Sequence, residues 1–475
     1  MTEVRHFLET FFNPKSVAII GASRNPRTAN YWLTANLVNL KYPGRIYPVN
    51  PNATELLGLK CYPSVKDIEG EVDLAAISVP AQSTPAVVRD CVEKGVKGIV
   101  IIAGGFSETG VEGKSLQDEV KRLLKDSGIR CLGPNALSPL NSALDLIIGF
   151  GPTDRLPRGR LSFIFQSGLY QPRLNYLLDE MHLNLNKLID LGNKMDINEV
   201  DALEYFQQDA STGVICIHME SIAGDGRRFF RLLKEITPQK PVIVLKSGRT
   251  PAGMKAASSH TGAIIKSSDI VFDTALRQGG ALRVQGLDEF FDLAKVFEYY
   301  PPLKGNRIAI ASFSGGEGVI TTDFCHFNGL TIAEPTSESV KKLHTIFPSW
   351  EIPANPFDTG VSSQFNPGID VVSVFADTLA DDPNVDCLAL QMGGPPQLAG
   401  MAPLERIEKV VTFYRGVVSR GKAVALWTTD PRSTKDMVDA LEASRIPVYP
   451  SAERAVRALG ALYRYGQVRK QASGG

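Results

Sequence analysis

Short apolar runs alternate with segments of helical spacing along the first third of the chain. Each run stops at a turn-forming residue, as is typical of buried strands. These runs are residues 17–20, 45–49, 73–79, 98–102 and 130–132. Helical spacing lies between them, for example over residues 31–40, 85–94 and 113–127. The alternation predicts an α/β fold with a parallel, doubly wound sheet that binds ligands at the carboxyl ends of its strands.

The same alternation recurs twice, after polar connections rich in proline and glycine at residues 151–159 and 301–305. The later strand-like runs include residues 161–165, 213–219, 241–245, 307–311, 387–391 and 423–427. A chain of 475 residues can form about three domains of ordinary size. We expect a Rossmann-like domain over residues 1–144, followed by flavodoxin-like domains over residues 145–302 and 303–475.

Charge and cysteine content exclude several classes of function. Lysine plus arginine and aspartate plus glutamate both number 51, so no net positive charge favours nucleic acid or an anionic membrane. The six cysteines are scattered, without a CxxC pair or metal-ligand spacing, and we expect buried free thiols in a reducing compartment. No signal peptide and no run of ~18 apolar residues is recognisable. The composition predicts a soluble, cytoplasmic protein without a metal site.

Three turns that follow strand-like runs combine glycine with serine. They are Gly21-Ala22-Ser23, Gln166-Ser167-Gly168 and Ser314-Gly315-Gly316. Such a turn at the start of a helix exposes backbone N–H groups and favours a phosphate. We expect Ser167 to cap the helix that follows it. The first turn lacks the full GxGxxG pattern and a clear acidic residue for a ribose, so it is a weak indication of a dinucleotide.

A segment rich in glycine, serine and alanine follows the strand-like run 241–245, and it ends near His260. We expect a loop here rather than an amphipathic helix. Small neighbours leave room beside the His260 ring for a bulky anion, which suits a nucleophilic imidazole; the alternative is an ordinary structural histidine. Glu220 follows the run 213–219, where a strand-end carboxylate points into the ligand cleft. Its alternative role is a surface salt bridge.

Several sequence motifs of this chain occur together in one known family. PKSVAIIGAS, YPGRIYPVNP, AGGFSETG and LGPN fall within about the first 140 residues, and SSHTGA surrounds His260. The chain thereby resembles the alpha subunit of nucleoside-diphosphate-forming acyl-CoA synthetases, the ADP-forming acetyl-CoA synthetase branch of the succinyl-CoA synthetase superfamily. The resemblance implies that residues 1–144 bind CoA, that 145–302 carry the catalytic histidine loop, and that 303–475 form a second ligase domain.

The resemblance also implies roles for individual residues. His260 would be phosphorylated transiently, and Glu220 would accept a hydrogen bond from one of its ring nitrogens. The residues matching the CoA contacts of the family are Gly21, Ser23, Arg45, Val79, Pro80 and Asn135. Those matching its phosphate contacts are Ser167, Gly168, Ser314, Gly315 and Gly316. The turn Leu191-Gly192-Asn193-Lys194 matches a family turn whose role is positional.

Two departures from the family pattern affect these expectations. Tyr170, Gln171 and Pro172 stand where small residues are usual. Because proline lacks an N–H group, Pro172 changes the early helix and the shape of the acyl pocket. Glu317 follows the third glycine turn, where a carboxylate is unfavourable beside phosphate unless it points away.

The activity implied by the resemblance is acyl-CoA + ADP + phosphate ⇌ carboxylic acid + ATP + CoA, through an acyl phosphate and a phosphohistidine. No ATP-grasp segment is recognisable, so the nucleotide and Mg2+ are expected to bind mainly to a separate beta subunit in an α2β2 heterotetramer. Two alternatives remain: a catalytically silent, CoA-binding regulatory subunit, and an NAD(P)-linked oxidoreductase that uses the first domain. The acyl group and the direction of flux are not set by the sequence.

Overall fold

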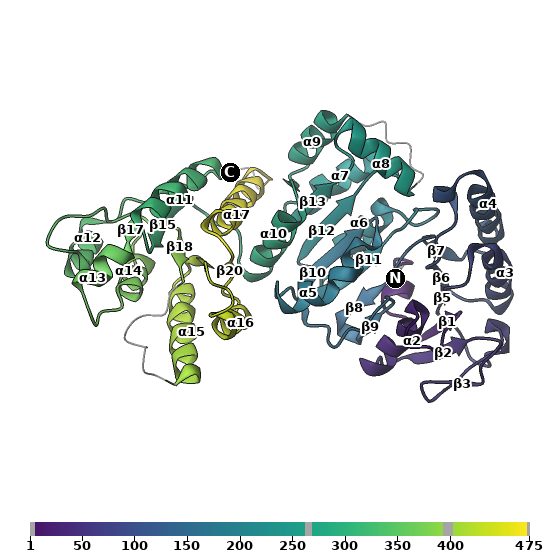
Figure 1. The fold of residues 1–475 in the computed structure, drawn as a ribbon. Coiled ribbons are helices and arrows are strands. Elements are labelled where there is room, and N and C mark those ends of the chain that lie inside the picture. Colours follow the sequence, from purple (N-terminus) through teal and green to yellow (C-terminus); the bar gives the residue numbers. More distant parts are fainter. Residues whose placement is uncertain (1–4, 262–267, 393–401, 473–475) are drawn as a thin grey trace. The chain divides into compact units, whose positions relative to one another are not determined.

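The computed structural model describes residues 5–261, 268–392 and 402–472 (Figure 1). The chain divides into two compact units, Met1–Phe290 and Phe291–Gly475. The first unit contains a five-stranded and a seven-stranded sheet, and the second unit contains a six-stranded sheet. The predicted α/β class with parallel sheets is confirmed.

The first sheet has the strand order β2-β1-β5-β6-β7, and every neighbouring pair is parallel. Its strands are β1 Ser16–Ile20, β2 Arg45–Val49, β5 Leu74–Ile77, β6 Gly98–Ile101 and β7 Arg130–Leu132. Its helices are α1 Glu9–Phe12, α2 Ala29–Asn39, α3 Thr84–Lys94 and α4 Val111–Lys125. Short elements between them are β3 Glu55–Leu56, β4 Leu59–Lys60, η1 Val65–Asp67, η2 Ala81–Ser83 and η3 Ser107–Thr109.

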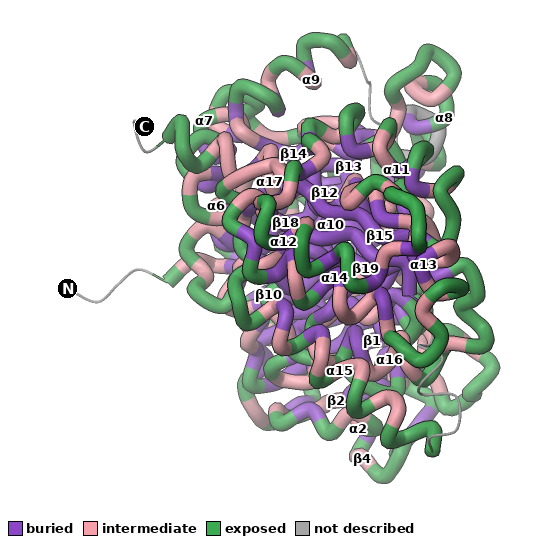
Figure 2. The backbone as a smooth tube through the Cα atoms, turned by 90° about the vertical axis from the view of Figure 1, so that its left-hand side faces the viewer, coloured by how far each residue is buried: buried purple, intermediate pink, exposed green. Residues whose placement is uncertain are grey.

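Both faces of this sheet are covered, because alternate residues of β1 enter different cores. Val17 and Ile19 pack with α1 and α2, whereas Ala18 and Ile20 pack with α3 and α4. The central strands β1, β5 and β6 are accordingly buried along their length, as the tube at β1 shows (Figure 2). A parallel sheet covered on both sides leaves only its strand ends open to ligands.

The second sheet has the order β14-β13-β12-β10-β11-β8-β9, with only β8 and β9 antiparallel. Its strands are β8 Leu140–Asn141, β9 Leu146–Ile147, β10 Arg158–Phe165, β11 Leu185–Asp190, β12 Val214–Met219, β13 Val242–Lys246 and β14 Leu282–Val284. Its helices are η4 Ser142–Leu144, η5 Gly168–Arg173, α5 Leu174–Asp179, α6 Glu199–Gln208, α7 Gly226–Ile236, α8 Pro251–Thr261, α9 Asp269–Gln278 and α10 Leu287–Tyr299. The expected domain boundary at residues 144 and 145 lies within the β8–β9 hairpin, which pairs with this sheet.

The third sheet has the order β16-β15-β18-β19-β20, and β17 also pairs with β15. Its strands are β15 Arg307–Ser312, β16 Thr331–Ile332, β17 Phe357–Asp358, β18 Cys387–Gln391, β19 Ala423–Trp427 and β20 Val448–Tyr449. Its helices are α11 Gly315–Phe327, α12 Ser337–Leu343, η6 His344–Ile346, α13 Thr359–Phe365, α14 Val371–Ala380, α15 Pro403–Ser419, α16 Lys435–Ala443 and α17 Ala452–Ala472.

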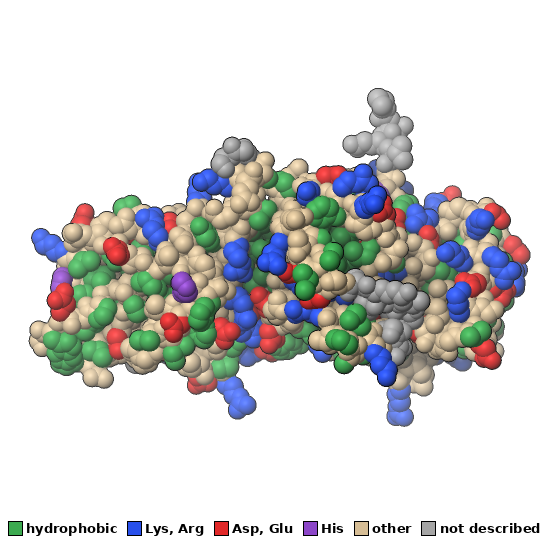
Figure 3. All heavy atoms as spheres, turned by 90° about the horizontal axis from the view of Figure 1, so that it is seen from above, with side chains coloured by type: hydrophobic (Ala, Val, Ile, Leu, Met, Phe, Trp, Pro, Cys, Tyr) green, Lys and Arg blue, Asp and Glu red, His purple; other side chains and the backbone are tan. Residues whose placement is uncertain are grey.

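The six cysteines are buried and free, as predicted. Among the described residues, no helix is long and apolar enough to cross a membrane. On the face drawn in Figure 3, lysine and arginine side chains are interspersed with aspartate and glutamate.

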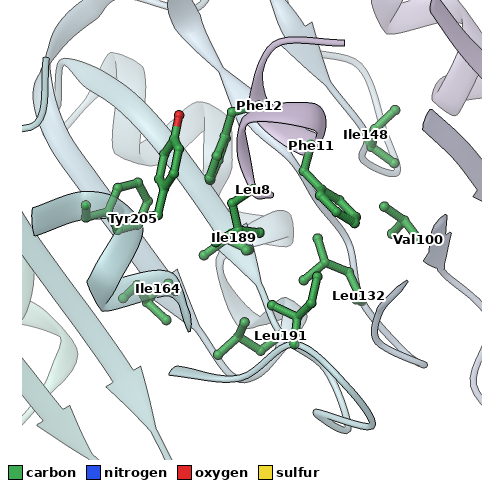
Figure 4. Packing of buried hydrophobic residues seen from close by; sticks show 14 of the residues in the cluster. Leu8, Phe11, Phe12, Val100, Leu132, Ile148, Ile164, Ile189, Leu191 and Tyr205 are labelled. Atoms are coloured by element: carbon green, nitrogen blue, oxygen red, sulfur yellow. The ribbon is translucent and has the colours of Figure 1, made fainter. Parts of the chain in front are cut away.

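One hydrophobic cluster joins the first two sheets (Figure 4). Phe11 and Phe12 of the short helix α1 enter it, together with Val100 and Leu132 of the first sheet and Ile189 of the second. The Phe12 ring is fully buried and stacks on Tyr205 at 5.0 Å between ring centroids. Helix α1 thus fills the space between two sheets and helps to fix their strand ends relative to each other.

We predict that Phe12→Ala lowers the free energy of unfolding of the first unit by about 3–5 kcal/mol, because the substitution leaves a cavity in this shared core. The unfolding midpoint in denaturant measures the effect. The control in the same unit is Tyr176→Ala, at a residue that is 56% exposed, with an expected change below about 0.5 kcal/mol. Equal losses in both variants would contradict this role of α1.

Candidate functional site

The turn after β1 is built around Gly21. Its φ is +89°, and a Cβ atom there would lie 2.5 Å from the Ser78 carbonyl oxygen. The Gly21 N–H donates to the Val49 carbonyl, and the Asn30 amide donates to the carbonyls of Gly21 and Ser78 at 3.0 and 2.9 Å. The turn is therefore fixed from the ends of three strands, and only glycine fits this close approach.

Most of the residues predicted to contact CoA lie at this carboxyl edge. Ser23 follows Gly21, and its hydroxyl accepts a hydrogen bond from the Asn25 N–H at 3.1 Å. Val79 and Pro80 follow β5, and Asn135 follows β7, where its N–H donates to the Ala103 carbonyl at 3.1 Å. The first sheet thus brings together five of the six predicted residues.

Arg45 is the exception. It is the first residue of β2 and pairs with Ser16, whereas the last residue, Val49, pairs with Ile20. Four residues of extended strand separate the two ends by about 13 Å. Arg45 lines a different pocket of about 430 Å³ at the amino ends of the strands, together with Lys15 and Lys97. In a parallel sheet all amino ends share one edge, so Arg45 does not lie with the other five.

Glu220 lies directly after β12 and is only 6% exposed. Its backbone N–H donates to the side-chain oxygen of Gln166 at 2.7 Å, and the Ser221 N–H donates to the same oxygen at 3.1 Å. Gln166 follows β10, the strand next to β12. The ends of the two strands are therefore tied together, and burial places Glu220 inside the edge rather than in an exposed surface salt bridge.

Lys194 is a residue of the site whose contacts could not be derived from the sequence. Its buried amine donates to the Gln166 side-chain oxygen at 2.9 Å and to the Ser221 carbonyl at 2.6 Å. It also forms an ion pair with Glu199 at 3.1 Å. Burial lowers the pKa of Lys194, while the Glu199 and Glu220 carboxylates act in the opposite direction. The only signal in the sequence was the position of the Leu191–Lys194 turn after a strand.

A second buried amine, that of Lys246, ends β13. Burial lowers its pKa, opposed first by Asp269 and more weakly by Glu220. Glu220 thus follows β12, Lys246 ends the neighbouring strand β13, and Lys194 reaches the Ser221 carbonyl, next to Glu220, from the turn after β11.

The carboxyl edges of the first two sheets are joined by hydrogen bonds between turns. The N–H groups of Asn193 and Met195 donate to the carbonyls of Pro134 and Gly133 at 2.9 and 3.0 Å. The Asn193 side-chain amide also donates to the Glu108 carboxylate. Glu108 in turn accepts a hydrogen bond from the Gly105 N–H at 2.7 Å. The turns at the carboxyl edges of the first two sheets are therefore held next to each other.

The expectation of a loop before His260 is wrong for residues 251–261, which form helix α8. Proline is favoured at the first position of a helix, and alanine, methionine and lysine have high helix propensity; these preferences outweigh the low amphipathicity. His260 belongs to the last turn of α8, its side chain lies outside the described part of the structure, and so do residues 262–267. Helix α8 lies against η3 of the first sheet.

The expectation that Ser167 caps an α-helix is also wrong. Residues 168–173 form the 3-10 helix η5, and the Ser167 side chain makes no capping hydrogen bond. Pro172 lies within this element and cannot donate a backbone hydrogen bond, so the α-helix begins only at Leu174. Tyr170 is fully buried and stacks on Phe165 at 5.1 Å, which fills the interior beneath the turn.

The third glycine turn begins helix α11 in the second unit. The Ser314 hydroxyl caps the helix by accepting a hydrogen bond from the Glu317 N–H at 3.3 Å, and Gly315 and Gly316 are exposed. The Glu317 carboxylate accepts a hydrogen bond from the Trp427 indole at 2.9 Å. The side chain that seemed unfavourable beside a phosphate is thus held at the end of β19 by Trp427.

Comparison with known proteins gives two family models. The CoA binding domain model matches residues 15–139, and the model of the succinyl-CoA ligase like flavodoxin domain matches residues 158–297. The chain is 37% identical to acetate–CoA ligase [ADP-forming] I subunit alpha of Pyrococcus furiosus, over 97% of this chain and 98% of that protein. It is 35% identical to acetate–CoA ligase [ADP-forming] II of Archaeoglobus fulgidus, over 98% of this chain and 68% of that protein.

A solved structure is similar over nearly the whole chain. It is the dinucleotide forming acetyl-coenzyme A synthetase 1 of Candidatus Korarchaeum cryptofilum, in complex with phosphate and ADP. The sequences are 33% identical, the TM-score is 0.86, and the match covers 98% of each chain. Sequence and structure therefore point to the same group of relatives.

We predict that Gly192→Ala lowers the stability of the first unit by about 2 kcal/mol or more, because this glycine joins the two sheet edges. Its φ is +54°, and a Cβ atom would lie 2.2 Å from the Pro134 carbonyl oxygen. The control is Gly226→Ala, where a Cβ atom meets nothing within 4 Å. Denaturant midpoints should separate the two variants, and an undiminished midpoint for Gly192→Ala would refute the steric argument.

Proposed function

The chain belongs to the family of ADP-forming acetate–CoA ligase alpha subunits, and we propose that His260 and Glu220 carry out the phosphoryl transfer of its reaction. It is an acid–CoA ligase subunit, and this activity interconverts acyl-CoA, ADP and phosphate with a carboxylic acid, ATP and CoA. The observation that carries the assignment is the match along almost the full length of both this chain and an alpha subunit. Neither a silent regulatory subunit nor an oxidoreductase is favoured by these relatives.

The proposed reaction has three steps. A phosphate oxygen attacks the thioester carbonyl, the C–S bond breaks, and CoA leaves as the thiol to give an acyl phosphate. A ring nitrogen of His260 then attacks the phosphorus and releases the carboxylate. The phosphohistidine finally gives its phosphoryl group to ADP, which forms ATP. The acyl phosphate and the phosphohistidine divide the overall reaction into successive transfers, each of which is easier than a single direct one.

Glu220 is proposed to orient the imidazole. A buried carboxylate that accepts a hydrogen bond from one ring nitrogen fixes the tautomer and leaves the other nitrogen as the nucleophile. It also stabilises the positive charge that develops on the ring as the new bond to phosphorus forms. The low exposure of Glu220 and the hydrogen bonds that fix its backbone support this role.

CoA is proposed to bind at the edge formed by Gly21, Ser23, Val79, Pro80 and Asn135. The absence of a side chain at Gly21 lets the phosphate part of the ligand approach the backbone closely. Val79 and Asn135 would line the cleft toward the thiol. Arg45 is left out of this proposal, because it lies at the opposite end of β2.

Two separate turns are proposed as phosphate contacts, each considered within its own unit: Ser167 and Gly168 in the first unit, and Ser314, Gly315 and Gly316 in the second. The stronger support is at α11, because a 13-residue helix with a serine cap has a partial positive charge at its N-terminus. At Ser167 the following helix is short and of the 3-10 type. There the proposal rests on the hydroxyl and the Gly168 backbone rather than on a helix dipole.

A separate ATP-grasp beta subunit is proposed to supply the nucleotide site, in an α2β2 assembly. Relatives named as alpha subunits imply a partner, and this chain covers only 68% of the longer Archaeoglobus protein. The part of that protein that this chain does not cover is proposed to correspond to a fused partner. Mg2+ is proposed to bind with the nucleotide, mainly at the partner subunit.

We predict that this subunit becomes phosphorylated on His260 when it is mixed with the beta subunit, Mg2+ and γ-labelled ATP. The adduct should be labile in acid and stable in base, and acetate together with CoA should discharge it. His260→Asn should abolish labelling and lower turnover by at least ~10³-fold, because no nucleophile remains. His218→Asn is the matched control, since it alters another histidine of the same unit. Label found on a different histidine by mass spectrometry would overturn the assignment.

We also predict that the chain binds CoA in preference to NAD, because the glycine turn is present without the dinucleotide pattern. Gly21→Ala should weaken CoA binding by at least about tenfold, since its Cβ atom would collide with Ser78. Calorimetric titration measures both ligands. Gly58→Ala serves as the control, because it has a positive φ but no neighbour within 4 Å of the added atom. Tighter binding of NAD than of CoA would contradict the domain assignment.

A further inference from the structure

The amine of Lys194 lies where the ends of three strands meet, and the reaction above gives it no task. It follows β11, contacts Gln166 after β10, and contacts Ser221 after β12. The Lys194 side chain is only 3% exposed, and its φ of +55° is unusual for a residue with a side chain. A lysine is thus held in a turn that glycine or asparagine would adopt more easily, with its charge buried.

Gln166 connects this amine to the backbone of Glu220. Its side-chain oxygen accepts hydrogen bonds from the Lys194 amine at 2.9 Å, the Glu220 N–H at 2.7 Å and the Ser221 N–H at 3.1 Å. Gln166 is itself 2% exposed, so no water replaces these donors. The position of the Glu220 backbone is therefore set by an oxygen that Lys194 holds in place.

Glu199 balances the charge and holds the other side of the same loop. One of its oxygens pairs with Lys194 at 3.1 Å, and the other accepts hydrogen bonds from the Ala223 and Gly224 N–H groups at 2.6 and 3.0 Å. The Lys194–Glu199 pair thus holds the backbone of residues 221–224, directly after Glu220, by hydrogen bonds. Burying charges costs desolvation free energy. The ion pair and the hydrogen bonds to both of its members offset that cost.

We propose that Lys194 is a positioning residue for the reaction: through Gln166 and Ser221 it fixes where the Glu220 carboxylate stands. The proposal rests on the assignment of Glu220 and His260 to phosphoryl transfer. Lys194 touches neither reacting atoms nor substrate in this account. Its effect passes through Glu220 alone, which distinguishes it from a lysine that only stabilises the fold.

The test uses the whole subunit with its beta partner and follows the single-turnover rate of phosphorylation by Mg-ATP. The double variant Lys194→Met/Glu199→Gln removes both buried charges and leaves neither unpaired. We expect phosphorylation to slow by roughly 10- to 100-fold, the loss typical of a misplaced catalytic group. CoA affinity, measured by calorimetry, should change less than twofold, because the bonds from this turn to Gly133 and Pro134 come from backbone N–H groups that both substitutions retain.

The same substitutions in a Glu220→Gln background decide between positioning and general support. If Lys194 acts through Glu220, the combined variant is less than twofold slower than Glu220→Gln alone, since coupled residues are not additive. Losses that multiply would overturn the proposal, as would a wild-type rate for the double variant. A wild-type rate for Glu220→Gln itself would instead remove the role of Glu220, and the present proposal with it.

A matched control uses the buried pair Lys187–Asp209 in the same sheet, which is 2.7 Å apart. Lys187 lies on β11 far from its carboxyl end, so Lys187→Met/Asp209→Asn should cost stability while the phosphorylation rate per folded subunit stays within twofold. Should the Lys194 double variant fail to fold, Gln166→Met breaks the same bridge without altering the charge pair. It is expected to slow phosphorylation at least tenfold, and an unchanged rate would overturn the proposal.

Discussion

The hydrogen bonds between the turns at 133–135 and 192–195 are the constraint on which the site depends. A parallel sheet collects its ligand-facing turns at one edge, but one edge provides only part of a site. Here the carbonyls of Gly133 and Pro134 accept hydrogen bonds from the neighbouring sheet's turn, and Gly192 permits the close approach. The edge proposed to bind CoA and the carboxylate proposed to orient a histidine thereby become neighbours.

Buried charge is the second feature of this edge. Lys194, Glu199, Glu220 and Lys246 are all at most 9% exposed, although isolated charges are unfavourable in such surroundings. Ion pairing and hydrogen bonding compensate for the loss of hydration. Each hydrogen bond also fixes the orientation of the groups that it joins. A carboxylate with the orienting role proposed for Glu220 benefits from surroundings that cannot rearrange. The burial that costs stability is therefore also what keeps the carboxylate in place.

The sequence predicted the strands well, because period and turn residues are local properties. Its errors fall where local preferences compete. Residues 251–261 were expected to be a loop and form α8, since helix propensity outweighs weak amphipathicity. Ser167 was expected to cap an α-helix, but Pro172 shifts the helix start to Leu174. Arg45 was grouped with Gly21, yet the register of β1 and β2 sends it to the opposite edge.

By itself the sequence determined the α/β class, the glycine turns and the motif around His260 that indicates the family. These follow from spacing and residue type along one stretch of chain. The tertiary structure decided which strand ends meet: Lys194, Glu199 and Gln166 are ordinary residues until the order β12-β10-β11 brings them together. Contacts between distant segments depend on sheet order and burial, neither of which a local pattern contains. The buried network around Glu220 was therefore visible only in the folded chain.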